Sequence, residues 1–345
     1  MTSTAALPAS QYVIFLPVRN GGDYLRLAID SVRAQTYTDW RLVILENGST
    51  DGTMDLALAQ SNIDPRISVV AASQDLGIVG NWQRVETLLR SGTVTAQFAT
   101  LIGHDDILYP NFLAAIERLL VEQPTAGLYQ TGFDLIDRQG QLIRPCKPLP
   151  THETSADFLS SRGWGQRDSF GIGYVFRVAD YLRVGGIPDL PLLMFSDDLL
   201  FARLAHPAGK ACTDEVACAF RMHAGSTSGS QSARRLSASI EALQCFLQHI
   251  ERDFPAYASS ARGKAATASL IAREALIFRS PLLRWALSPA ANQAINELHG
   301  KYGMCANGVF RGRWLGSGLV TRDVYIAMRT AFLALSLLRE RLRQK

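Results

Sequence analysis

The first 135 residues of the chain alternate between two patterns of apolar side chains. Short runs of consecutive apolar and β-branched residues predict buried strands, and the segments between them repeat apolar residues at helical spacing. The predicted strands are Tyr12–Val18, Arg41–Leu45, Ile67–Ala71 and Phe98–Ile102. Strands that alternate with helices at this spacing predict parallel pairing with right-handed crossovers. We therefore expect an α/β fold with a Rossmann-like, doubly wound and mostly parallel sheet.

The pattern changes after Gly127. Leu128–Leu135 and Gln141–Ile143, joined by a polar turn, predict a β-hairpin, and Ala211–Met222 predicts a last strand. The stretch from Gly225 to Ala233 is rich in Ser and Gly, as linkers are. Beyond it the patterns are helical, over Leu236–Ile250, Ala265–Phe278, Ala291–Leu298 and Val324–Leu342. We predict a catalytic α/β domain over residues 10–230 and a helical C-terminal region over residues 235–345.

Composition narrows the class of protein. The chain has 345 residues, and its 47% hydrophobic content is enough for a packed core. The net charge of +4 is too small to indicate a nucleic-acid partner. The five cysteines include no CxxC pair, so zinc and redox chemistry are not expected. Because we find neither a secretory leader nor a segment of membrane-spanning length, we expect a cytoplasmic protein.

The segment after the fourth predicted strand is chemically the most informative. The apolar run Phe98–Ile102 is followed by two adjacent acids, Asp105 and Asp106, and Pro110 is expected to open the next helix. Open α/β sheets bind ligands at the carboxyl ends of their strands. Two carboxylates at that edge suit a divalent cation, which commonly serves a diphosphate. The alternative is that Asp106 is only a turn residue or a helix cap.

Other short motifs restrict the class of nucleotide ligand. No GxGxxG sequence follows the first strand, which disfavours an NAD-type fold, and the absence of a GxxxxGK motif excludes a P-loop. The second strand is instead followed by residues 47–52 (NGSTDG), a turn with helix-capping residues.

In order and spacing, these elements resemble the family 2 inverting nucleotide-sugar glycosyltransferases, over about Tyr12 to Ser228. Residues 13–22 (VIFLPVRNGG) are similar to the first strand and loop of that family, and residues 31–40 (SVRAQTYTDW) resemble its S-x-x-x-Q-T-Y turn. Residues 46–53 (ENGSTDGT) are similar to its D-D-G-S-T-D-G-T signature. The remaining matches are His104-Asp105-Asp106 at the metal-binding position, the late pair Asp197-Asp198, and the closing motif Arg221-x-His223.

The resemblance implies the GT-A fold and a metal-dependent, hexosyltransferase-type activity. Such an enzyme moves a sugar from a nucleotide-diphosphate donor to a hydroxyl group of the acceptor, with inversion at the anomeric carbon. By analogy with the family, the acceptor is a glycan or a lipid-linked glycan in surface polysaccharide or glycoconjugate assembly. The expected cofactor is Mg²⁺ or Mn²⁺, which acts as a Lewis acid as the sugar–phosphate bond breaks.

Matching residue by residue gives a set of candidate binding residues. Contacts with the donor are expected from Pro17, Arg19, Glu46, Asn47, Asp105 and Arg221, and the metal ligands are expected to be Asp106, Asp105 and His223. Simpler interpretations stay open, because Arg19-Asn20 and Asn47 also suit a turn, and His223 and Arg221 also suit a structural role at a strand end.

Two positions depart from the family pattern. Glu46-Asn47 stand where the family usually has two acids, and Gly103 stands where many members carry the first acid of an Asp-x-Asp motif. An asparagine amide both donates and accepts hydrogen bonds, so the preferred nucleotide base is not specified. Metal binding then depends on Asp105 and above all on Asp106.

The general base is expected to be Asp197 or Asp198, and we narrowly favour Asp198. A positioned carboxylate that takes the acceptor proton typically contributes about 10²–10⁴-fold to the rate. The alternative is that Ser196-Asp197-Asp198 only caps the helix predicted over Leu199–Leu204.

The C-terminal helix Val324–Leu342 is apolar and ends in a basic segment. Residues 311–345 hold eight basic residues against two acidic ones. Such a helix packs on its own domain, joins a homodimer, or attaches the protein peripherally to the inner face of the membrane.

Two rival functions remain for the whole chain: a sugar nucleotidyltransferase, and a non-catalytic nucleotide- or carbohydrate-binding scaffold. A nucleotidyltransferase needs a glycine- and basic-rich loop after the first strand to hold a triphosphate, and this segment contains only Arg19 and Arg26 as basic residues.

Overall fold

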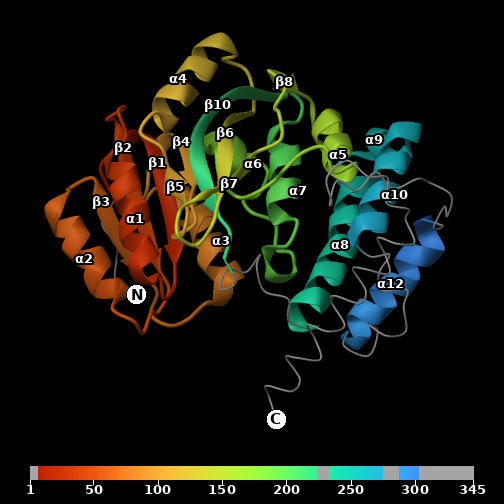
Figure 1. Ribbon diagram of the computed structural model, residues 1–345, viewed down its shortest axis with the longest axis horizontal. Coiled ribbons are helices and arrows are strands. Elements are labelled where there is room, and N and C mark those ends of the chain that lie inside the picture. Colours follow the sequence, from red (N-terminus) through yellow and green to blue (C-terminus); the bar gives the residue numbers. More distant parts are fainter. Residues whose placement is uncertain (1–6, 224–232, 275–286, 303–345) are drawn as a thin grey trace. The chain divides into compact units, whose positions relative to one another are not determined.

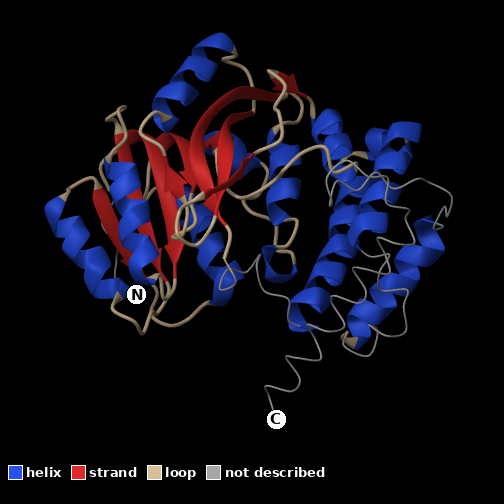
Figure 2. Cartoon of the chain, in the orientation of Figure 1, coloured by secondary structure: helices blue, strands red, loops and turns tan. Residues whose placement is uncertain are grey.

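The computed structural model describes residues 7–223, 233–274 and 287–302, and the statements below concern this part of the chain. It divides into two compact units, each of which we describe by itself. The first comprises residues up to 158 together with residues 167–189 and 196–223. The second comprises residues 159–166, residues 190–195 and the described residues after 223. All described strands lie in the first unit, whereas the second is helical (Figure 2).

The first unit is built on a ten-stranded mixed sheet with helices on both faces (Figure 1). The order along its main path is β3-β2-β1-β4-β9-β6-β10-β5, with β7 paired to β6 and β8 paired to β10. The strands are β1 (Ser10–Val18), β2 (Trp40–Glu46), β3 (Ile67–Ala71), β4 (Ala96–Leu101), β5 (Ile107–Leu108), β6 (Leu128–Ile136), β7 (Leu142–Pro145), β8 (His152–Glu153), β9 (Tyr174–Arg177) and β10 (Lys210–Arg221). The helices are α1 (Gly22–Arg33), α2 (Thr53–Ile63), α3 (Gly77–Arg90), α4 (Phe112–Glu122), α5 (Ser155–Gly163), which continues into the second unit, α6 (Val178–Arg183) and α7 (Ser196–Leu204).

The first half of the sheet confirms the sequence prediction. Strands β3, β2, β1 and β4 are parallel, and the apolar runs of β1, β2 and β4 are buried on both faces, as parallel strands between two helical layers must be. The outer strand β3 is buried only at Ile67. One face packs against α1 and α2 through Leu25, Ile29 and Ala57. This arrangement brings the carboxyl ends of the four strands to one edge of the sheet.

The second half contains a strand that the sequence analysis did not predict. The short strand β9 is antiparallel to both β4 and β6. Its hydrophobic pattern is hard to recognise because a glycine-rich sequence precedes Tyr174. Because β9 runs against both neighbours, β6 is parallel to β4, and β10 is parallel to β6. The carboxyl ends of β6 and β10 therefore lie at the same edge as those of the first four strands. The predicted hairpin is present as the pair β6–β7.

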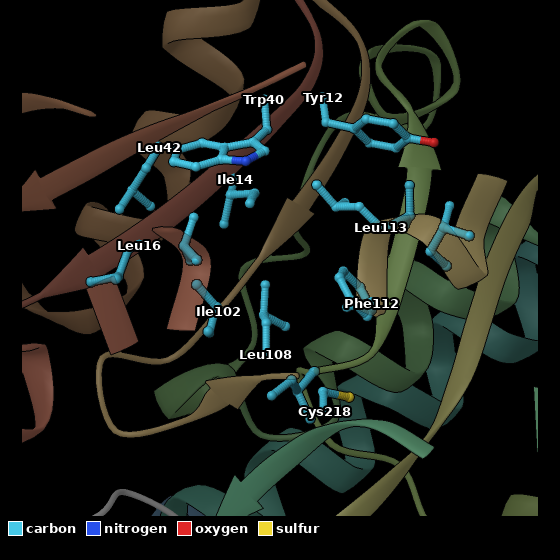
Figure 3. Packing of buried hydrophobic residues seen from close by; sticks show 14 of the residues in the cluster. Tyr12, Ile14, Leu16, Trp40, Leu42, Ile102, Leu108, Phe112, Leu113 and Cys218 are labelled. Atoms are coloured by element: carbon cyan, nitrogen blue, oxygen red, sulfur yellow. The ribbon is translucent and has the colours of Figure 1, made fainter. Parts of the chain in front are cut away.

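One apolar cluster joins both halves of the sheet. It includes Ile14 and Leu16 of β1, Phe112 of α4 and Cys218 of β10, which Figure 3 shows packed around a common centre. Ile102 and Leu108 belong to the same cluster and are almost completely buried. The acidic segment between these two residues is therefore anchored in the core at both ends.

The start of α4 differs from the prediction. The helix begins at Phe112 rather than at Pro110. The carbonyl group of Pro110 accepts hydrogen bonds from the amide and the hydroxyl group of Thr36, at 2.9 and 3.0 Å. Pro110 thus closes the loop after α1, and Asn111 takes the N-cap position.

The second unit consists of helices over the described residues. They are α8 (Ala233–Asp253), α9 (Pro255–Ser259), α10 (Ala261–Glu274) and α12 (Pro289–Tyr302), with a single turn of 3-10 helix, η1 (Pro191–Leu193), beside α8. Three of the four predicted C-terminal helices correspond to α8, α10 and α12. The predicted helix Val324–Leu342 and most of the Ser/Gly-rich linker lie outside the described residues. None of the described helices combines the length and apolar character needed to cross a membrane.

Candidate active site

Several predicted site residues gather at the edge where the parallel strands end. Pro17 is buried near the end of β1, Glu46 ends β2, and Arg221 ends β10. The acid loop, which we define as residues 103–106, follows β4. This is the edge at which open α/β sheets bind their ligands.

Asp106 is the most enclosed member of the acid loop. Only 3% of its surface is exposed, and its Oδ1 accepts a hydrogen bond of 2.9 Å from the backbone amide of Arg221. Its own amide donates to the carbonyl group of Gly103 at 3.2 Å. The last residue of β10 therefore fixes the direction of this carboxylate.

Asp105 and His223 form the second contact between the acid loop and the segment after β10. Their Oδ2 and Nε2 atoms lie 2.8 Å apart, and both side chains are largely buried. The ring of His223 also packs 5.2 Å from that of Tyr24 in α1. The sequence analysis placed His223 among the metal ligands, and the structure brings it beside the predicted ligand Asp105.

Arg221 holds the acid loop and a neighbouring turn together. Its Nε donates to the carbonyl group of Asp105 at 2.8 Å, and its Nη1 donates to the carbonyl groups of Asp137 and Arg138 at 3.1 and 3.3 Å. The guanidinium group lies 4.9 Å from the ring of Tyr24. The side chain therefore donates to backbone carbonyl groups in this structure and positions the acid loop, and its contact with the donor stays a prediction.

Electrostatics favour a cation beside the acid loop. Burial, together with the charge of Asp105, raises the pKa of Asp106 well above its usual range, despite the hydrogen bond and the charge of Arg221. Burial lowers the pKa of His104, while the carboxylate of Asp105 opposes that shift. Two enclosed carboxylates repel each other, and a divalent cation between them would remove the repulsion.

The geometry at Gly103 fits such an ion. A Cβ atom at this position would lie 2.8 Å from Asp105 Oδ1 and 2.8 Å from Asp106 Oδ2, so the two oxygens converge on the space that glycine leaves open. Mg²⁺ and Mn²⁺ are commonly held by one or two carboxylates together with substrate phosphate. Within the described residues no group of three or more His, Cys, Asp or Glu side chains forms a metal site. Two carboxylates converging on one point are consistent with an ion that the substrate helps to hold.

Glu46 and Asn47 are buried, and their polar atoms bond to the protein. The Glu46 carboxylate accepts hydrogen bonds from the amides of Gly48 and Ser49, at 3.1 and 2.6 Å. Asn47 Nδ2 donates to Asp75 Oδ1 at 3.0 Å, and Asn47 Oδ1 accepts from the amide of Leu76 at 3.0 Å. The two residues thus shape the loop after β2 and tie it to residues 75–77.

The loops after β1 and β2 are also joined directly. Asn20, with a left-handed φ of 53°, accepts a hydrogen bond from the amide of Thr50 at 2.8 Å and donates its own amide to Ser49 Oγ at 2.9 Å. The amide of Gly21 donates to Thr53 Oγ1 at 2.8 Å. Asparagine is among the few residues that tolerate this backbone conformation, which accounts for its place in the motif.

Arg19 is exposed at the edge of this region. Its Nε lies 3.1 Å from Asp75 Oδ2, and both side chains are nearly half exposed. An exposed ion pair of this kind contributes little to stability. The guanidinium group therefore remains accessible to an anionic ligand such as a diphosphate.

The second acid pair lies in the first turn of α7. Asp198 is buried, with 3% of its surface exposed, whereas Asp197 is only partly buried. Burial, followed by the charge of Asp198, raises the pKa of Asp197 to about 7. A carboxylate with that pKa is matched to proton transfer near neutral pH. These observations favour Asp197 as the base, whereas the sequence analysis narrowly favoured Asp198.

A chain of contacts connects the second acid pair with the acid loop. A Cβ atom on Gly171 would lie 3.1 Å from Asp197 Oδ2, so the backbone there passes directly beside this carboxylate. The neighbouring Phe170 stacks on Phe220 of β10 at 4.3 Å between ring centroids. Arg221, which holds Asp106, is the next residue.

The sequence analysis missed three residues at this edge. Asp75 links Asn47 to Arg19, Tyr24 covers Arg221 and His223, and Asp168 binds Arg144 at the end of β7. Each lies in a loop or on the surface of a helix, where the hydrophobic pattern carries no signal. Only the spacing of Asp75 from the third strand would have drawn attention to it.

Sequence comparisons relate part of this region to a known family. Residues 13–160 match the model of glycosyl transferase family 2. An uncharacterized glycosyltransferase of Rickettsia felis is 30% identical over 155 residues, which are 42% of this chain and 24% of that protein. TuaG of Bacillus subtilis, a putative teichuronic acid biosynthesis glycosyltransferase, is 34% identical over 148 residues, 43% of this chain and 56% of that protein. The matches thus span about a quarter and just over half of these two relatives.

Solved structures show the same fold. TarS of S. aureus in complex with UDP-GlcNAc has a TM-score of 0.56 at 14% identity, covering 90% of this chain and 98% of that one. The mannosyltransferase PcManGT of Pyrobaculum calidifontis, in complex with GDP-Man and Mn²⁺, has a TM-score of 0.51 at 17% identity, covering 94% of this chain and 81% of that one. These likenesses confirm the predicted GT-A architecture.

Proposed function

We propose that the chain, whose residues 13–160 match the model of glycosyl transferase family 2, transfers a sugar from a nucleotide-diphosphate donor to a hydroxyl group of an acceptor. One observation carries the proposal: Asp105 Oδ1 and Asp106 Oδ2 converge over Gly103 at the carboxyl edge of the parallel strands. Carboxylates in this arrangement suit a divalent cation, which would stabilise the negative charge of the departing nucleoside diphosphate.

The acid loop would hold Mg²⁺ or Mn²⁺ through Asp106 and Asp105, with His223 orienting Asp105 or joining the ligands. Bound there, the ion would supply Lewis-acid stabilisation of the leaving diphosphate. Arg221 fixes the loop through the Asp105 carbonyl group and the Asp106 carboxylate. The exposed guanidinium group of Arg19 is available to the donor.

Asp197 is proposed as the general base. In the reaction, its carboxylate takes the proton of the acceptor hydroxyl group while the hydroxyl oxygen bonds to the anomeric carbon. The bond from that carbon to the donor phosphate breaks on the opposite face, which gives inversion. Asp197 is more accessible than Asp198, and its pKa of about 7 leaves much of it ionised at neutral pH. Asp198 then keeps the pKa of Asp197 high through its charge.

The relatives suggest the class of substrates. The structural neighbours bind UDP-GlcNAc and GDP-Man, and TuaG is named for teichuronic acid biosynthesis. We propose a nucleotide-diphosphate sugar as donor and a glycan or lipid-linked glycan of a surface polysaccharide as acceptor. Pro17, Glu46 and Asn47 would line the pocket for the nucleobase of the donor. Glu46 and Asn47 would contribute indirectly, through the loops that they hold.

The test is turnover of a panel of nucleotide-diphosphate sugars by the full chain, with Mn²⁺ and after chelation. We expect release of a nucleoside diphosphate from at least one donor, abolished by the chelator and restored by Mn²⁺. Proton NMR of the product sugar should show the anomeric configuration opposite to that of the donor.

The same assay separates the rival functions. A sugar nucleotidyltransferase would instead release pyrophosphate from a nucleoside triphosphate and a sugar phosphate. A non-catalytic scaffold would be stabilised by a nucleotide sugar in a thermal-shift measurement without turning it over. Either result would contradict the proposed function.

A further inference from the structure

Asp168 makes an unusually complete set of contacts for a loop residue. Its two carboxylate oxygens accept hydrogen bonds from Arg144 Nη1 and Nη2, at 2.7 and 3.0 Å. The amide of Lys147 donates to it at 2.9 Å, and Lys147 Nζ lies 3.5 Å away. Only 9% of the side chain is exposed. Although burial raises the pKa of Asp168, these partners lower it below the usual value, so the residue is ionised in the folded protein.

The preceding residue is anchored as firmly. Arg167 donates from Nη2 to Glu153 Oε1 at 2.8 Å and from Nη1 to the carbonyl group of Pro148. Glu153 also pairs with the fully buried Lys210 at 2.6 Å. Two consecutive residues are thus fixed by separate sets of charged partners, and the chain that follows leaves from a fixed point.

That following segment, residues 169–173, leads to the proposed base. Its Phe170 stacks on Phe220, and the carbonyl group of Gly173 accepts a hydrogen bond of 3.0 Å from the amide of Thr131. Between these two attachments, Gly171 presents its backbone to Asp197, with the position of a Cβ atom only 3.1 Å from Asp197 Oδ2. Nothing larger than glycine fits there without moving the carboxylate.

We propose that Asp168 is a positioning residue for the base: by fixing residues 169–173, it holds the Gly171 backbone against Asp197 and keeps that carboxylate partly shielded from water. The inference rests on the proposed function, in which Asp197 takes the acceptor proton. In the described part of the chain, Asp198 is the charged group that acts on Asp197. The phenol of Tyr174 in β9, whose pKa is raised mainly by burial, interacts with the charge of Asp198. Asp168 acts through the backbone rather than through its own charge.

The first variant is Asp168→Asn, which preserves the size of the side chain but weakens its grip on Arg144. We expect kcat at pH 7 to fall about tenfold, with the donor KM little changed, because the base is misplaced after the donor has bound. The rise of kcat with pH should also move to lower pH by about half a unit, because water that reaches Asp197 stabilises its charged form.

Asp64→Asn is a matched control. Asp64 is also 9% exposed in its side chain, accepts two side-chain hydrogen bonds from Arg66 at 3.0 and 2.8 Å, and has a second cation, Arg33, at 3.6 Å. It lies before β3, at the opposite edge of the sheet. We expect this variant to lose stability as Asp168→Asn does, but to leave the pH dependence of kcat unchanged.

Gly171→Ala probes the same contact without touching the anchor. Its Cβ atom would press on Asp197 Oδ2, so kcat should fall while the Asp168 contacts persist. The control is Gly300→Ala, where a Cβ atom meets nothing within 4 Å. A loss of activity in Gly171→Ala equal to that in Gly300→Ala would overturn the inference.

A measurement without substrate separates this inference from the proposed function. Carbon-13 NMR of the Asp197 carboxyl group in the full chain reports its pKa directly. A lower pKa in Asp168→Asn, with no change in Asp64→Asn, supports the positioning role whether or not turnover is found. An unchanged pKa in Asp168→Asn, or an equal shift in Asp64→Asn, overturns it. Absence of turnover with every donor would overturn only the proposed function.

Discussion

The chain contains two Asp-Asp pairs at its candidate site, and the same dipeptide is treated differently in each. In the acid loop, Asp106 accepts the Arg221 amide and Asp105 bonds to His223, so donors hold both carboxylates in place. In α7, Asp197 lies against the backbone of Gly171 beside the buried Asp198, and its pKa rises to about 7. We propose that the first pair stays in position around a cation and that the second exchanges a proton.

The contrast shows that the surroundings, rather than the residue type, decide what a carboxylate does. Fixed donors and a second acid make a site that attracts a cation. Burial beside a like charge raises the pKa of Asp106 and of Asp197 alike, so the first pair differs in the hydrogen bonds that hold its carboxylates. The predictions that follow test each side of this contrast.

The largest effect is expected from Asp106→Ala. Removing this carboxylate leaves Asp105 as the remaining acid of the loop and exposes the Arg221 amide, so we expect turnover with Mn²⁺ to fall about 10⁴-fold. Titration of the full chain with Mn²⁺ should show weaker binding of the ion. Turnover equal to that of the Asp64→Asn control would reject the assigned metal site.

Asp197→Asn should lower kcat about 10³-fold while leaving Mn²⁺ binding intact. In the unmodified chain, the base must be ionised, so kcat should rise with pH up to about pH 7 and then level off. Asp198→Asn should retain more activity and shift this rise to lower pH, because a neighbouring negative charge is lost. If Asp198→Asn proves the more damaging of the two, the roles of these acids are reversed.

Gly103→Ala tests the metal site while keeping both carboxylates of the acid loop. Its Cβ atom would approach oxygens of both Asp105 and Asp106 at 2.8 Å, so the carboxylates must move apart. We expect about tenfold weaker Mn²⁺ binding and a similar loss of turnover at limiting Mn²⁺, both partly recovered at high Mn²⁺ concentration. An unchanged Mn²⁺ affinity would show that the ion does not depend on this convergence.

The smallest effect concerns stability. The raised pKa of Asp197 means that the folded chain binds a proton more tightly than the unfolded chain does, so this residue makes stability fall as pH rises from about 4 to about 7. Asp197→Asn removes that fall. Its Tm should therefore exceed that of the unmodified chain by a few degrees at pH 8, and the difference should narrow towards pH 4. A lower Tm for the variant at pH 8 would contradict this.

Hydrophobic patterning predicted the parallel half of the sheet, in which strands and helices alternate along the chain. The runs that became β1, β2 and β4 are buried on both faces, and their alternation with helices predicted the parallel pairing. The short strand β9 gave no such signal, because its four residues lie between a glycine-rich segment and α6. Its antiparallel pairing depends on partners far away in the sequence, which a local pattern does not contain.

The candidate site was predictable for a similar reason. Asp105, Asp106 and Arg221 adjoin strand ends, so a correct strand assignment brought them together. Asp168 and Tyr24 act through contacts with loops and carbonyl groups, and their positions in the sequence resemble those of any surface residue. The contact between Asp197 and the backbone of Gly171 joins residues distant in the sequence, so only the folded chain reveals it.

The acid loop has a fixed length as well as a fixed chemistry. Ile102 and Leu108, on either side of the loop, are both buried in one apolar core, so an extra residue between them would have to be accommodated within the loop itself. An insertion would either expose one of these apolar side chains to water or displace the carboxylates from the proposed cation site. Related sequences should therefore keep the length of this segment as strictly as they keep its acids.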